Sequence, residues 1–209
     1  EVGDFHFRTL AHDAGIRLAA NIKPHLLTTH PQFETLRASG GLIRDSESDA
    51  PALCRFWSGG AFESGEGGYV DFTSQAGYDW WKAQLKTALL DFGVDAAWND
   101  NNEYEIWDDD ARCAGYGREI PLAQARPLQS LQMARASYEA IGEHAPDERP
   151  FVLSRSGCPG IQRYAQTWSG DNTTSWHTLR YNIPMGLSMG LSGAPNTGHD
   201  VGGFYGPAP

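Results

Sequence analysis

The chain has 209 residues, of which 40% are hydrophobic, and it carries a formal net charge of -10 at pH 7. Such a chain can bury a substantial core as one large domain or two small ones. Its negative charge disfavours nucleic acid and anionic membranes, which attract basic patches, and favours a neutral partner. The sequence has no run of about 18 apolar residues, so we expect no membrane-spanning helix.

The first predicted elements are a helix and a strand. Residues 4–14 are expected to be helical, and residues 16–22, which read IRLAANI, form a short apolar strand before Pro24. A polar, glycine-rich stretch runs from about residue 39 to residue 70. We predict that this stretch is a loop insertion.

A second helix and strand follow the insertion. Thr73 or Ser74 can cap a helix that ends at Gly93, and residues 94–98 form the next buried strand. The helix is predicted from apolar residues that recur every three or four positions: Tyr78, Trp81, Leu85, Leu89 and Phe92.

The same alternation continues to the end of the chain. A helix ends at Gly142, a third strand starts at residue 150, and short strands are expected near 164–168 and before Gly198. The helix that ends at Gly142 has an apolar stripe at Leu128, Leu131, Tyr138 and Ile141. A last helix between the short strands contains Pro184, which should kink it. Alternating helices and strands predict a parallel α/β sheet.

Polar residues follow each predicted strand. In (β/α) barrels the catalytic groups stand at the C-terminal ends of the strands, which favours a barrel over an open sheet. We therefore predict an α/β fold of the (β/α)8 TIM type. The clusters are Asn21–Lys23, Asn99–Asp100, Ser154–Arg155, Ser169–Asp171 and His199–Asp200.

Each carboxylate in these clusters has two interpretations. Asp100 could be a nucleophile or base, or it could cap the next turn. Asp171 could be its partner or the N-cap of the following helix. The run Asp108–Asp110 lacks the glycine and ligand spacing of a calcium loop, and His199 lacks a metal-binding partner motif. We expect no metal, and no cofactor, because the glycines match no phosphate-binding fingerprint.

The three cysteines are an odd number without metal-ligand spacing, which favours a reducing compartment over a disulfide framework. Asn172 opens a glycosylation sequon inside the predicted site, where a glycan would block access. Both features predict a cytoplasmic, bacterial protein and leave secretion as the alternative.

Four segments resemble family 31 of the glycoside hydrolases, whose members are chiefly retaining α-glucosidases and α-xylosidases. They occur in the family's order over nearly the whole chain: FWSGGAFESGEGGYVDFTSQAGYDWW, AAWNDNNE, RPFVLSRSGCPGIQRYAQTWSGDN and LSGAPNTGHDVGGF. The resemblance implies that Asp100 is the catalytic nucleophile and Asp171 the general acid and base. It also implies that Arg155 and Asp200 bind sugar hydroxyls. The implied walls of the pocket are Trp57, Trp98, Trp168 and Phe204.

A retaining glycosidase needs two carboxyl groups about 5 to 5.5 Å apart with unequal pKa values. We expect Arg155 and neighbouring amides to keep Asp100 ionised. The negative charge of Asp100 and the ring of Trp168 should keep Asp171 protonated. Glu103 is expected to hold the loop.

The chain departs from the family's commoner pattern near the site. Lys23 stands where many members have an aspartate, and it either contacts the substrate or pairs with a carboxylate of the same rim. Asn101 and Tyr104 replace the more frequent methionine and proline.

Residues 1–209 resemble about the third to the seventh strand, so we expect a partial catalytic barrel whose flanking parts lie outside this chain. The predicted substrate is an α-linked gluco-oligosaccharide. Alternatives within the enzyme class are an α-xylosidase, an α-galactosidase, an α-transglucosidase and a lyase. A non-catalytic carbohydrate-binding protein is the main alternative of another class, and a structural protein is less favoured.

Overall fold

The computed structural model describes the backbone of residues 3–57 and 64–207 and the side chains of residues 7–56 and 65–207. Its centre is a five-stranded sheet in the order β1-β5-β8-β9-β10, with every neighbouring pair parallel. The strands are β1 (Ala19–Ile22), β5 (Ala96–Asn99), β8 (Val152–Ser154), β9 (Gln166–Trp168) and β10 (Thr197–Gly198). Strands that follow the chain order in parallel form part of a (β/α) barrel, which confirms the predicted fold class.

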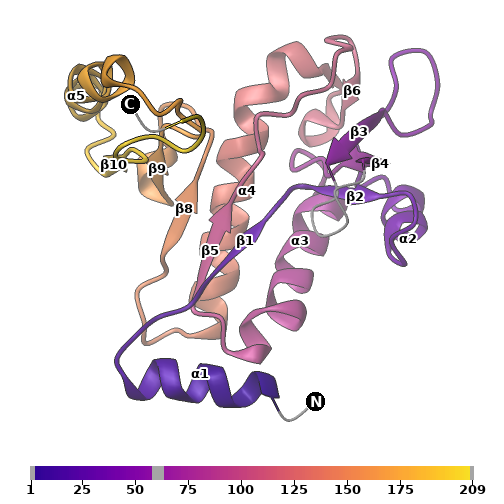
Figure 1. Cartoon of the computed structure of the whole chain (residues 1–209). Coiled ribbons are helices and arrows are strands. Elements are labelled where there is room, and N and C mark those ends of the chain that lie inside the picture. Colours follow the sequence, from indigo (N-terminus) through magenta and orange to yellow (C-terminus); the bar gives the residue numbers. More distant parts are fainter. Residues whose placement is uncertain (1–2, 58–63, 208–209) are drawn as a thin grey trace.

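Helices accompany the strands (Figure 1). They are α1 (Gly3–Asp13), α3 (Gln75–Ala88), α4 (Leu122–His144) and α5 (Trp176–Leu191), with short turns η1 (Leu90–Phe92), η2 (Gly115–Gly117) and η3 (Ile161–Arg163). Helices α3 and α4 lie side by side, joined by a hydrogen bond of 3.0 Å from Trp81 Nε1 to Ser137 Oγ. The predicted helix was expected to end at Gly93, but α3 ends at Ala88, and Gly93, at φ 81°, ends the separate turn η1. None of the described helices is long and apolar enough to cross a membrane.

The prediction of a loop at residues 39–70 is wrong. This stretch contains β3 (Leu53–Trp57) and β4 (Ser64–Tyr69), which join β2 (His25–Leu27) in an antiparallel sheet beside the short helix α2 (Phe33–Ala38). A Cβ atom at Gly67 would lie 2.1 Å from the carbonyl oxygen of Leu26. The glycine therefore permits the close pairing of β2 and β4 instead of marking a loop. A two-stranded sheet, β6 (Arg112–Cys113) with β7 (Ile120–Pro121), precedes α4.

The buried face of α4 also differs from the prediction. The expected stripe is only half-buried at Leu128, Leu131 and Tyr138, and the helix continues beyond Gly142 to His144. Small residues dominate the buried face: Ala125, Ser130, Ala134, Ala136, Ser137 and Ala140. Small side chains let the helix approach the sheet closely, so an analysis of large apolar residues alone finds only part of the buried face, which includes the predicted Ile141.

A buried carboxylate ties the start of α3 to the segment before β7. Asp71 is 1% exposed, and its Oδ1 accepts hydrogen bonds from Thr73 Oγ1 at 2.6 Å and Gln129 Nε2 at 2.8 Å. Its Oδ2 accepts one from the Ala114 amide at 2.7 Å. The Ser74 hydroxyl donates to the Gly40 carbonyl, so neither predicted capping side chain caps α3.

We expect Asp71→Ala to lower the free energy of unfolding by about 3 kcal/mol or more, because several buried donors would lose their acceptor. Urea unfolding of the enzyme that contains this chain measures the change. The control is Asp13→Ala, at an exposed position of α1, which should stay within about 0.5 kcal/mol of the wild type. Equal losses in the two variants would contradict the structural role of Asp71.

Candidate active site

The predicted nucleophile stands at the C-terminal end of the second strand of the sheet. Asp100 directly follows β5, its amide donates to the Ile22 carbonyl at 2.9 Å, and the residue is 9% exposed. Side chains alternate between the two faces of a strand, so the side chains of Asp100 and Trp98 lie on the same face. Trp98 in turn pairs in register with Asn21 of β1. The Asp100 carboxylate is therefore directed toward the neighbouring strand ends.

Among the described residues, four groups contact the Asp100 carboxylate. Its Oδ2 accepts from Asn21 Nδ2 at 3.0 Å and from Lys23 Nζ at 3.2 Å. Its Oδ1 accepts from the Asn101 amide at 2.8 Å and from Arg155 Nη1 at 3.4 Å. Burial raises the pKa of Asp100, but the hydrogen bonds of Asn21 and Asn101 and the charge of Lys23 outweigh burial, and the net pKa is lowered. The direction of this pKa shift favours the ionised form that we expected, and Asn21 is a partner of Asp100 that the sequence did not indicate.

Arg155 joins the two predicted catalytic carboxylates. It follows β8, and its amide donates to the Asn99 carbonyl at 3.0 Å. Its Nη1 lies 3.4 Å from Asp100 Oδ1 and 3.2 Å from Asp171 Oδ1, so these two oxygen atoms are no farther apart than the sum of the two distances. Its Nε lies 2.6 Å from Glu103 Oε1. Glu103 therefore fixes the arginine from the loop after β5, as expected for a loop-holding residue.

Asp171 lies in the loop after β9, with its side chain 38% exposed and paired with Arg155. The capping interpretation of Asp171 is wrong, because the N-cap of α5 is Ser175, whose hydroxyl accepts from the Thr178 amide. The loop is tied to the segment after β10 by the Phe204 amide, which donates to the Asn172 carbonyl at 2.7 Å. The segments that follow β9 and β10, the last two strands of the sheet, therefore contact each other.

The predicted aromatic walls are only partly assembled. The rings of Trp98 and Trp168 meet edge to face, with centroids 5.6 Å apart, and both line a cleft of about 610 Å³ together with His199 and Asp200. Phe204 is 63% exposed and is not among the residues that line this cleft. The side chain of Trp57 lies outside the described residues.

His199 is half-buried and hydrogen-bonded through one ring nitrogen. Its Nδ1 lies 2.9 Å from Ser169 Oγ, in the loop that carries Asp171. Among the described side chains we find no group of three or more His, Cys, Asp or Glu residues that could hold a metal ion.

Lys23 pairs with the rim carboxylate, which was one of its two predicted roles. Besides Asp100, its Nζ contacts Asn101 Oδ1, and Asn101 adopts a left-handed backbone conformation with φ 46°. The lysine therefore holds the side chains of two consecutive residues at the end of β5.

In a plot of kcat/KM against pH, we expect Lys23→Met to shift the acidic limb to higher pH. The reason is that loss of the cation raises the pKa of Asp100. The ionised carboxylate would then form only at higher pH. Lys23→Arg keeps the charge and should preserve the limb, and Lys86→Met on α3 serves as a distant control. An acidic limb that stays in place in Lys23→Met would refute the electrostatic role.

A family model and several known proteins match this chain. The family model "Glycosyl hydrolases family 31 TIM-barrel domain" matches residues 6–209. Alpha-glucosidase 2 of Bacillus thermoamyloliquefaciens is 32% identical over 164 residues, which are 73% of this chain and 20% of that enzyme.

Two solved structures have similar folds. A glucosidase II alpha subunit has a TM-score of 0.82 at 27% identity, over 98% of this chain and 22% of that one. A GH31 alpha-xylosidase from a soil metagenome, complexed with xylose, has a TM-score of 0.84 at 25% identity, over 97% of this chain and 29% of that one. The present chain thus spans less than a third of each of these relatives.

Proposed function

Because this chain belongs to family 31 of the glycosyl hydrolases, we propose that it carries the catalytic carboxylates of a retaining α-glucosidase that acts on α-linked gluco-oligosaccharides. The observation that supports this proposal most strongly is the contact of Arg155 Nη1 with both Asp100 and Asp171. This shared contact supports the proposal because it limits the separation of the two oxygen atoms to the sum of the two distances. The double-displacement mechanism needs about 5 to 5.5 Å between the two carboxyl groups.

In the proposed first step, Asp100 attacks the anomeric carbon while the bond from that carbon to the departing oxygen breaks and Asp171 donates its proton to that oxygen. In the second step Asp171 takes a proton from water, the water oxygen bonds to the anomeric carbon, and Asp100 is released. The contacts support this division of roles, because three polar groups besides Arg155 hold Asp100 as an anion. Among the side chains that the structure describes, the Asp171 carboxylate pairs with Arg155 alone.

Arg155 is proposed to hold the two carboxylates apart before substrate binds and then to donate to a sugar hydroxyl. Burial lowers the pKa of Arg155, but the carboxylates of Glu103, Asp171 and Asp100 outweigh burial and raise it, so the guanidinium stays charged. Trp98 and Trp168 are proposed to pack against the apolar C–H faces of the sugar, and Asp200 to bind a hydroxyl. Trp57 and Phe204 are proposed to complete the wall of the pocket when substrate is bound.

The names of the similar proteins support α-glucosides as the substrate class, since the bacterial relative is an alpha-glucosidase and one structural neighbour is a glucosidase II alpha subunit. The alpha-xylosidase neighbour supports an α-xyloside as the second candidate.

The test is hydrolysis of 4-nitrophenyl α-glucoside and α-xyloside by the full enzyme that contains this chain, followed by NMR of the first sugar released. We expect faster hydrolysis of the glucoside and α-glucose as the first anomer. Faster hydrolysis of the xyloside would support the second candidate. Release of β-glucose as the first anomer would exclude the retaining mechanism, and absence of hydrolysis would favour a carbohydrate-binding protein.

We further propose that residues 1–209 are the third to the seventh strand regions of a longer catalytic barrel. Among the described strands, β1 and β10 each pair on one side only, so closure of a barrel requires further strands. We propose a cytoplasmic location, which the free thiols of Cys54, Cys113 and Cys158 support. Cell fractionation with antibody detection would test the location.

A further inference from the structure

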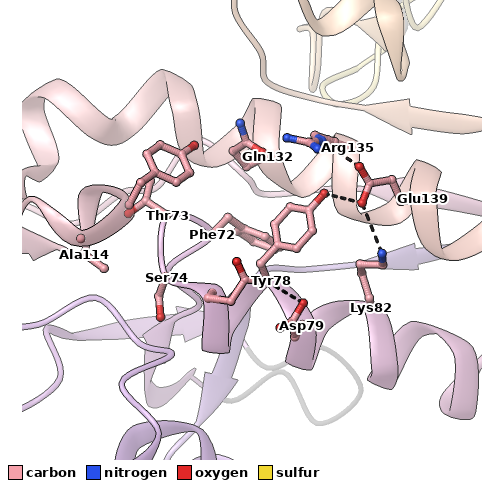
Figure 2. A pocket seen from close by; sticks show the side chains of 13 residues that line it. Phe72, Thr73, Ser74, Tyr78, Asp79, Lys82, Ala114, Gln132, Arg135 and Glu139 are labelled. Carbon is pink, nitrogen blue, oxygen red and sulfur yellow. Dashed lines mark hydrogen bonds and ion pairs between the residues drawn. The ribbon is translucent and has the colours of Figure 1, made fainter.

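A second cavity lies between α3 and α4, away from the residues of the candidate active site. It measures about 560 Å³, and we call it the α3–α4 cavity. Its walls come from the two helices and from the segments before α3 and around η2. The lining side chains available to a ligand include Tyr78, Lys82, Tyr116, Gln132, Arg135 and Glu139. Figure 2 shows Gln132 and Arg135 on one helix facing Tyr78 on the other, with Glu139 between Tyr78 and Lys82. We propose that this cavity is a second binding site for a neutral, hydroxyl-rich glycan.

The charges in the cavity are balanced, which disfavours an ionic ligand. Glu139 Oε2 accepts from Tyr78 Oη at 2.9 Å and from Lys82 Nζ at 3.2 Å, and its Oε1 accepts from Arg135 Nε at 2.8 Å (Figure 2). Asp79 Oδ1 accepts from Gln75 Nε2 at 2.9 Å. The two cations of the lining, Lys82 and Arg135, thus match its two carboxylates, Asp79 and Glu139. Such a surface offers donors and acceptors together, as a ligand with many hydroxyl groups requires.

One aromatic ring is held at this cavity in a constrained, exposed position. Tyr116 is 61% exposed and adopts a left-handed backbone conformation with φ 59°, which is unusual for an aromatic residue. Its amide donates to the Thr73 carbonyl at 3.1 Å, and the Gly115 amide donates to Thr73 Oγ1 at 2.9 Å. The Ala114 amide is in turn fixed by buried Asp71. Strained residues that surrounding structure holds in place occur often at ligand-binding sites.

The combination of these groups matches the chemistry of a sugar. A pyranose has an apolar C–H face that can pack on the exposed ring of Tyr116. Its hydroxyls can bind the amide of Gln132 and the charged groups nearby. Because α3 runs back along the sheet before β5 begins, its first turn lies at the end of the barrel where Asp100 stands. A glycan held in the α3–α4 cavity is therefore retained at the same end of the molecule as the candidate active site.

This inference goes beyond the proposed function, and its test does not require hydrolysis. The full enzyme carrying Asp100→Asn is run on native gels that contain soluble starch or dextran, and its retardation is compared with and without Tyr116→Ala. We expect Tyr116→Ala to weaken binding about fivefold or more, as loss of an aromatic anchor does. The matched control is Tyr181→Ala on α5, which removes a tyrosine of similar exposure, 58%, and should leave retardation unchanged. Tyr116→Trp keeps a ring and should retain binding even if the alanine variant folds poorly.

In the enzyme with Asp100 intact, Tyr116→Ala should leave kcat/KM for 4-nitrophenyl α-glucoside unchanged, because a single sugar does not use the second site. Equal retardation of the Tyr116→Ala protein and its parent would overturn the proposal, as would an equal loss in Tyr181→Ala. If the enzyme shows no glycosidase activity but Tyr116→Ala still lowers retardation, the proposed function fails and the second site stands.

Discussion

Replacing Asp100 by Ala is expected to reduce kcat for α-glucosides on the order of 10⁴-fold or more, because the residue forms the covalent bond of the intermediate. The control is Asp108→Ala in the same acidic stretch, a residue that contacts the Asp110 amide of its own loop and should be dispensable. Residual activity of Asp100→Ala within tenfold of the wild type would contradict the nucleophilic role.

Sodium azide provides a second test of the nucleophilic role of Asp100. With Asp100→Ala and an activated α-glucoside, azide can occupy the vacated space and bond to the anomeric carbon from the face opposite the leaving group. The expected product is the β-glucosyl azide. An α-glucosyl azide would show that the covalent intermediate still forms, and hence that another residue is the nucleophile.

Replacing Asp171 by Ala is expected to lower kcat/KM for substrates with poor leaving groups by about 10²- to 10⁴-fold, the usual contribution of general acid catalysis. Glucosyl fluoride needs no proton on its leaving group, so its kcat/KM should fall far less. Azide should now intercept the glycosyl-enzyme and give the α-glucosyl azide. Equal losses for oligosaccharide and fluoride would remove Asp171 from the acid role.

The parallel sheet was predictable because its strands carry a local signal. The first strands are short apolar runs that end in polar residues, as in Ala96–Asn99 followed by Asp100. The antiparallel insertion has no such signal. Gly67 contributes no side chain, and its presence in β4 reflects the close approach of the backbone of Leu26, which is distant in the sequence. Local composition does not predict contacts between residues that are distant in the sequence.

The site was predictable in its residue types but less so in its contacts. The family resemblance supplied Asp100, Asp171 and Arg155, and the structure brings all three together. Asn21 was missed as a partner of Asp100, because an amide inside an apolar run has no distinctive spacing. The alternation of side chains along β1 and the pairing of Asn21 with Trp98 place Asn21 on the same face of the sheet as Asp100. That pairing joins residues 77 positions apart, so the sequence alone does not reveal it.

Covalent trapping of the glycosyl-enzyme identifies the nucleophile. The full enzyme is incubated with 5-fluoro-α-glucosyl fluoride, digested with trypsin and analysed by mass spectrometry. Cleavage after Lys86 and Arg112 releases Asp100 in residues 87–112, and cleavage after Arg163 and Arg180 releases Asp171 in residues 164–180. We predict a fluoroglucosyl adduct on the first peptide, localised by fragmentation to Asp100. An adduct on the second peptide would reverse the assigned roles, and absence of any adduct from an enzyme that turns over α-glucosides would contradict a covalent intermediate on this chain.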